Sequence, residues 1–157
     1  MTKFKIIRWI LKFFISLFLL LIAANTSAIY TILYDSSVPK ATVTLLCTSI
    51  PITLMFVIGL YYIHQSCTMF IRRGYFNTKS AQYLSTGGYI MMIKAIISLI
   101  LIAVFFDAKK DTIELIRNLE SNVSFNTILI IIGLSLVAIS DIIKQGEIIK
   151  TENDLTV

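Results

Sequence analysis

Long apolar runs separated by short charged segments dominate this chain. A run of about 20 apolar residues is long enough to cross the hydrocarbon core of a bilayer as a helix. The pattern predicts spans at residues 9–34, 41–70, 88–106 and 125–143, followed by a cytoplasmic tail at 144–157. No internal repeat divides residues 1–157, so we expect a single all-α domain, a four-helix transmembrane bundle with antiparallel spans.

The first run also has features of a secretory signal peptide. Basic residues precede an apolar core, and Thr26 and Ala28 could serve as the small residues of a cleavage site. Apolar character continues through Leu33, however, which makes the run longer than an ordinary signal core. We therefore favour an uncleaved first helix over a cleaved signal.

Composition supports lipid as the solvent. The chain is 57% hydrophobic and 15% charged, with a mean hydropathy of +0.84, whereas soluble domains are about 25% charged. A net charge of +5 would point to nucleic acid in a soluble protein. Here most basic residues lie in short segments between apolar runs, so we expect no direct contact with nucleic acid.

The charges also predict the topology. The start of the chain is basic, and the connection between the second and third runs contains Arg72, Arg73 and Lys79 without an acid. The loop after the third run mixes acids with bases, and its apolar spacing around Ile113 and Ile116 predicts a short amphipathic helix on the outer surface. Since positive charge holds loops in the cytoplasm, we expect both termini there, an N-in/C-in arrangement.

The end of the chain resembles a known family. The segments DIIKQGE (141–147) and ENDLTV (152–157) are similar to the end of DUF2975, a family of small bacterial four-helix membrane proteins of unknown function. The basic connection with Arg73, Gly74 and Phe76 fits that pattern too, although it lacks the Pro and Phe-Ser start typical of the family. The resemblance implies a multi-pass protein of the bacterial inner membrane. It also implies a cytoplasmic partner, because members are often encoded beside an Xre-type helix-turn-helix regulator.

Lys94 is the candidate site residue within the membrane, because the third span is otherwise uncharged. An ammonium at the bilayer centre costs about 2.5–3.5 kcal/mol on insertion scales. If the membrane begins near Gly88, Lys94 could reach the head groups by extending its side chain. Alternatively, Lys94 pairs with Asp141, which we expect at a similar depth in the last turns of the fourth span.

His64 is a second candidate polar site, in the cytoplasmic half of the second span. It could bond to a neighbouring helix, act as a proton or metal site, or contact a head group. A sole histidine supplies no second imidazole for a triad or metal, and no catalytic or phosphate-loop motif occurs in the chain. We expect neither an enzyme nor a cofactor, and we interpret Cys47 and Cys67 as buried apolar residues.

The cytoplasmic face offers a third candidate. The acids of the tail could meet the basic connection and close a polar cap beneath the bundle. Alternatively, the same face binds a cytoplasmic protein. The candidate partner surface then consists of Arg72, Arg73, Glu152, Asn153 and Asp154.

Two functional hypotheses follow. The first is a non-enzymatic regulatory or sensory membrane protein that engages a cytoplasmic helix-turn-helix regulator. The second is a small transport, lipid-binding or small-molecule-binding protein with a polar site around Lys94 and Asp141, expected to work as a homo-oligomer. A water-accessible cavity at Lys94 would favour the second hypothesis.

Overall fold

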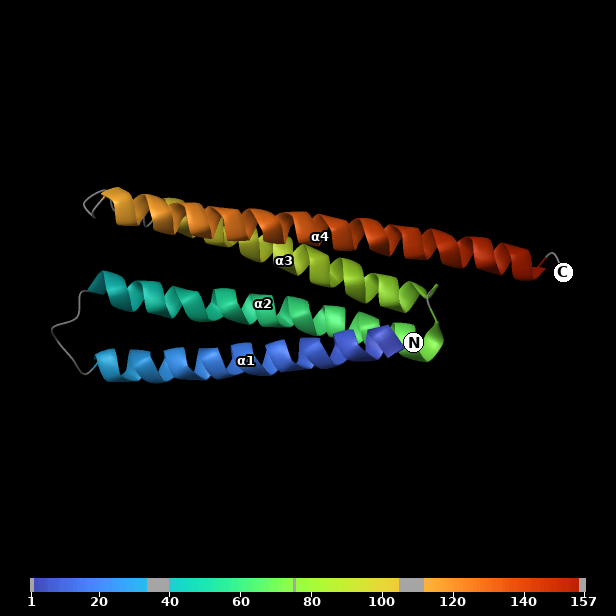
Figure 1. Cartoon of the computed structure of the whole chain (residues 1–157), viewed down its shortest axis with the longest axis horizontal. Helices are drawn as coiled ribbons and strands as arrows, with labels where there is room; N and C mark the ends of the chain where they lie inside the picture. The colour runs from blue at the N-terminus through green and yellow to red at the C-terminus, as the bar shows by residue number, and fades with distance from the viewer. Residues whose placement is uncertain (1, 34–39, 75, 105–111, 156–157) are drawn as a thin grey trace.

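The computed structural model describes residues 2–33, 40–74, 76–104 and 112–155, which form helices without any strand. All four helices contain segments long and apolar enough to cross a membrane. The polar turn at 35–39 and the charged loop at 105–111 lie outside the described residues. The helices are α1 (Thr2–Leu33), α2 (Lys40–Arg73), α3 (Thr78–Val104) and α4 (Thr112–Leu155) (Figure 1).

The helices pack as an open row. Within the described residues, α1 contacts α2, α2 contacts α3 and α3 contacts α4, whereas α1 and α4 do not meet. The ring centroids of Phe4 and Phe70 lie 5.3 Å apart, so the start of α1 packs against the end of α2. Figure 1 shows α1 beginning and α4 ending at the same end of the molecule. We call this the terminal end and the opposite one the loop end.

Each helix begins before the span predicted for it, and α3 shows why. Asn77 accepts a hydrogen bond from the backbone N–H of Lys79 at 2.9 Å, as a helix N-cap does. Polar residues therefore form the first turns of α3, ten residues ahead of Gly88. The preceding helix ends at Arg73 and is followed by Gly74, whose φ of 88° suits a residue without a side chain.

The fourth helix is much longer than the predicted span. It is continuous from Thr112 to Leu155, so it includes the predicted outer helix and residues 144–155 of the predicted tail. The structure does not describe the side chains of residues 112–119. As a result, α4 extends past α3 at the terminal end (Figure 1).

Helix α3 packs between α2 and α4, and its buried residues are mostly small. By contrast, none of the described side chains of α1 is buried, and Trp9, Phe13 and Leu20 are among its many exposed apolar residues. Small residues inside and large apolar residues outside are typical of helices that pack in lipid. The buried residues of α3 recur at spacings of three and four: Ser80, Ala81, Leu84, Gly87, Gly88, Met91, Lys94, Ala95 and Ser98.

Candidate functional site

A stripe on α4 faces α3 along the whole contact. Its members recur every seventh residue, the period that keeps one helix face against a neighbour. All of them are polar or small, and the small members let the two helices approach closely. The stripe consists of Asn126, Gly133, Ser140 and Glu147.

Glycines bring the two backbones together in the middle of this contact. A Cβ atom added to Gly88 would lie 2.7 Å from the carbonyl oxygen of Gly133. One added to Gly133 would lie 2.7 Å from the carbonyl oxygen of Gly88. Because the obstacle on both sides is backbone, neither position accepts a side chain without moving the helices apart.

Buried serines fix the register at the terminal end. Ser140 is fully buried and donates a hydrogen bond to the carbonyl oxygen of Ala81 at 2.8 Å. Ser66 of α2, also fully buried, donates to the carbonyl oxygen of Ser80 at 2.8 Å. Both hydroxyl groups thus bond to successive carbonyl groups of α3, one from each neighbouring helix.

The connection between α2 and α3 packs against α4 about one turn of α3 before Ala81. Glu147 accepts a hydrogen bond from the hydroxyl group of Thr78, the first residue of α3. A Cβ atom on Gly146 would meet the ring of Phe76, so that ring lies directly against α4. These contacts mark the level at which α4 leaves the row.

Lys94 lies toward the loop end and is buried among three helices. Its Nζ donates a hydrogen bond to Oδ1 of Asn126 at 3.1 Å. The same atom lies 5.3 Å from the ring centroid of Phe125 and 6.0 Å from that of Phe56. Only 8% of Lys94 and 3% of Asn126 is exposed.

These contacts extend across the row to α1. The rings of Phe18 and Phe56 pack edge to face, with centroids 5.0 Å apart. One cross-section of the molecule therefore joins all four helices. We call it the Lys94 layer, made of Phe18, Phe56, Lys94, Phe125 and Asn126.

The layer accounts energetically for a cation in the membrane. A hydrogen bond to a charged group contributes about 1.5–3 kcal/mol. Each cation–π contact contributes about 0.5–1 kcal/mol, or more when water is excluded. Their sum is similar to the insertion cost of about 2.5–3.5 kcal/mol, so Lys94 is tolerated without a carboxylate.

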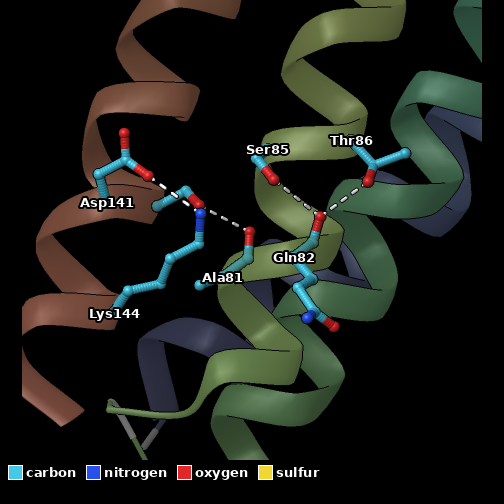
Figure 2. Close-up of polar contacts among 7 residues, drawn as sticks. Ala81, Gln82, Ser85, Thr86, Asp141 and Lys144 are labelled. Carbon is cyan, nitrogen blue, oxygen red and sulfur yellow. Dashed lines mark hydrogen bonds and ion pairs between the residues drawn. The ribbon is translucent and has the colours of Figure 1, made fainter. Parts of the chain in front are cut away.

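The structure does not bring Lys94 and Asp141 together. Asp141 is exposed and pairs with Lys144 of its own helix at 3.0 Å (Figure 2). Its neighbour Ser140 bonds Ala81, which lies 13 residues before Lys94, or about 20 Å along the helix. The pairing assumed that the membrane begins near Gly88. Because α3 begins at Thr78, Lys94 lies beyond the middle of the helix, far from Asp141.

Figure 2 also shows polar side chains on α3 near the terminal end. The hydroxyl groups of Ser85 and Thr86 donate to the carbonyl oxygen of Gln82, at 3.0 and 2.9 Å. These bonds stay within α3, so they satisfy the side chains without linking helices. At this end of the molecule, the hydrogen bonds between α3 and α4 involve Ser140 and Glu147 instead.

His64 lies on the side of α2 that faces α1. Its Nε2 atom is buried and has no hydrogen-bond partner among the described residues. Lys12 and Arg8 of α1 are near enough for their charges to act on the ring. Within the described part of the chain, no three His, Cys, Asp or Glu side chains gather closely enough to hold a metal ion.

The candidate partner surface divides between two helices. Arg72 and Arg73 are exposed at the end of α2, whereas Glu152, Asn153 and Asp154 are exposed on the last turns of α4. The contact recorded between α4 and the connection comes from Glu147 and Thr78. Glu147 is one of the tail acids expected in the polar cap, and it meets the connection at Thr78.

The sequence patterns missed the residues that surround Lys94. Asn126 lies one position inside the predicted fourth span, and Phe56 and Phe125 look like ordinary lipid-facing residues. The seven-residue spacing of Asn126, Gly133 and Ser140 was the available signal. Of the small residues in the fourth span, Gly133 and Ser140 face α3, while Ser135 and Ala138 are exposed.

Comparison with known proteins gives one result. The model of the family described as "Protein of unknown function (DUF2975)" matches residues 21–157. This is the family that the closing segments of the sequence resemble. No curated protein and no solved structure matches the chain.

Proposed function

Since this chain belongs to the DUF2975 family, to which no activity is assigned, we propose a function from its structure: a non-enzymatic regulatory protein of the bacterial inner membrane. Its helices alternate in direction across the bilayer, and both termini lie in the cytoplasm. The basic residues at the start of α1 and the end of α2 support this orientation, because both sets lie at the terminal end. In this orientation the end of α4 lies in the cytoplasm, where we propose that it binds a partner protein.

The observation that carries the proposal is the part of α4 beyond Glu147. Residues 148–155, which we call the projecting end, continue the helix for about 12 Å past the start of α3. Ile148 is 56% and Leu155 86% exposed, although both are apolar. Spaced seven residues apart, they lie on one face of the helix together with Glu152.

Such a face fits recognition of a helix by an apolar groove. In that mode a partner takes up apolar residues from one side of an amphipathic helix, and charged residues around them set the orientation. Ile149 widens the apolar face, and Glu152 and Asp154 add negative charge around it. The partner we propose is a helix-turn-helix regulator with an apolar groove bordered by basic residues.

The attachment of the projecting end makes it responsive to the rest of the row. Thr78 with Glu147, and Phe76 with Gly146, hold α4 against the connection between α2 and α3. A shift of the α3–α4 pair against α1 and α2 would therefore move the projecting end relative to the membrane surface. A partner that prefers one of the two positions would respond to the shift.

Co-purification tests the proposal. The triple variant Ile148→Ser, Ile149→Ser, Leu155→Ser should insert normally and lose a bound helix-turn-helix protein from native membranes. The matched control is Lys150→Gln, on the opposite face of the same turns. Mass spectrometry of the purified complexes reads the outcome. Equal recovery of the regulator with the triple variant and the wild type would refute the proposal.

A further inference from the structure

The buried ammonium group of Lys94 has no carboxylate partner among the described residues. It has three N–H donors, and its recorded hydrogen bond goes to the neutral oxygen of Asn126. Asp141 pairs with Lys144 at the terminal end, far from this ammonium group. Buried charges in proteins are normally paired, so Lys94 retains unused capacity for a negative group.

The ammonium is held at a defined position. Asn126 donates from Nδ2 to the carbonyl oxygen of Asn122 at 2.8 Å, which turns its Oδ1 toward Lys94. The rings of Phe56, from α2, and Phe125, from α4, also restrict the position of the Lys94 side chain. A cation fixed by its neighbours can bind an anion without first losing side-chain freedom.

The layer lies close to the lipid-facing surface. Phe125 covers the ammonium, yet 53% of this residue is exposed. The described residues of α2 and α4 both pack on α3 and do not contact each other. A ligand therefore has to displace one exposed ring to reach Lys94.

The surroundings favour an amphiphile over a free ion. Lys94 lies 10 residues before the end of α3, or about 15 Å along the helix. Next to the layer, Val123 and Ile128 of α4 expose apolar side chains. A hydrated ion would cross this apolar surface at a cost, whereas a hydrocarbon chain packs along it.

We propose that the Lys94 layer binds the oxyanion head group of an amphiphile from the leaflet at the loop end. The head group is a phosphate or a carboxylate, and it accepts hydrogen bonds from the two N–H groups that Asn126 does not use. The hydrocarbon chain lies along the apolar surface of α4 beside Phe125. This site is separate from the projecting end and does not depend on the proposed regulatory function.

Binding to the full chain in phosphatidylcholine nanodiscs tests the site. Phosphatidylglycerol, oleate and inorganic phosphate are titrated in separate arms, with native mass spectrometry as the readout. Lys94→Met should weaken binding of phosphatidylglycerol or oleate by about tenfold or more, the loss of a charged contact. The control Lys144→Met removes the same charge at the terminal end and should bind like the wild type.

A second variant keeps the test informative if Lys94→Met folds poorly. Asn126→Asp places a carboxylate beside the ammonium, so it should weaken binding by a similar factor while the protein stays folded. If phosphatidylglycerol binds more strongly than oleate, the head group is a phosphate; if oleate binds more strongly, it is a carboxylate. Wild-type binding by both variants, or binding of inorganic phosphate alone, would overturn the proposal.

Discussion

The contact between α3 and α4 differs in kind from the contact between α1 and α2. Between α3 and α4, glycines meet backbone to backbone and a buried serine bonds across the interface. Between α1 and α2, large rings touch, as in Phe4 with Phe70, and none of the described side chains of α1 is buried. In lipid, apolar contact alone gives little drive for association, because acyl chains offer the same contact. The difference indicates a rigid α3–α4 pair, with α1 more loosely attached at the edge of the row.

The largest effect should come from a side chain between α3 and α4. Gly88→Ala places a Cβ atom 2.7 Å from backbone of α4, and overpacking of this kind costs about 1–3 kcal/mol. We expect a loss at the upper end of that range, measured as the free energy of unfolding in mixed micelles.

Gly59→Ala is the matched control for this substitution. Its Cβ atom would meet the flexible side chain of Met91 at 3.2 Å, so α2 and α3 can adapt. A loss as large at Gly59 as at Gly88 would remove the contrast between backbone and side-chain contacts.

The Lys94 layer should give the next largest effect. Asn126→Leu leaves a buried ammonium without its hydrogen bond, which should cost about 1.5–3 kcal/mol. Lys94→Met in the same chain removes the buried charge, so the double variant should recover most of the loss. Simple additivity of the two free energies would show that the residues do not act as a pair.

A smaller effect should follow from the buried serine. Ser140→Ala removes the bond to Ala81, and hydrogen bonds between helices in a membrane contribute about 0.6–1.7 kcal/mol. The control is Ser135→Ala, because Ser135 is exposed and bonds the carbonyl oxygen of Ile131 in its own helix. Equal losses would mean that the bond across the interface adds nothing.

The smallest effect should come from α1. Phe18→Ala removes the edge-to-face contact with Phe56, and such a pair contributes about 0.5–1.5 kcal/mol beyond area burial. We expect a loss near the lower end, because lipid replaces the lost apolar contact. Leu20→Ala, on the exposed side of α1, serves as the control. A loss larger than that for Gly88→Ala would reverse the ranking of the two interfaces.

Apolar run length predicted the number of helices but not their ends. Polar residues 144–155 looked like a tail, since hydropathy registers lipid contact rather than backbone conformation. Helices continue through the head-group region wherever a cap and neighbouring contacts support them, as Asn77 does for α3.

The error at Lys94 follows from those ends. Its depth was counted from Gly88, the first residue of the apolar run, instead of from Thr78, the first residue of the helix. That shift selected Asp141 as the partner in place of Asn126. The close approach of Gly88 and Gly133 depends on how two distant helices are aligned, which no local pattern contains.

The register between α3 and α4 underlies both the projecting end and the Lys94 layer, and disulfide cross-linking measures it directly. In a chain without its native cysteines, the pair Ala81→Cys and Ser140→Cys should cross-link readily in membranes under mild oxidation. The pair Lys94→Cys and Asp141→Cys should stay unlinked, because about 20 Å of helix separates their levels. Cross-linking of the second pair in preference to the first would contradict the account.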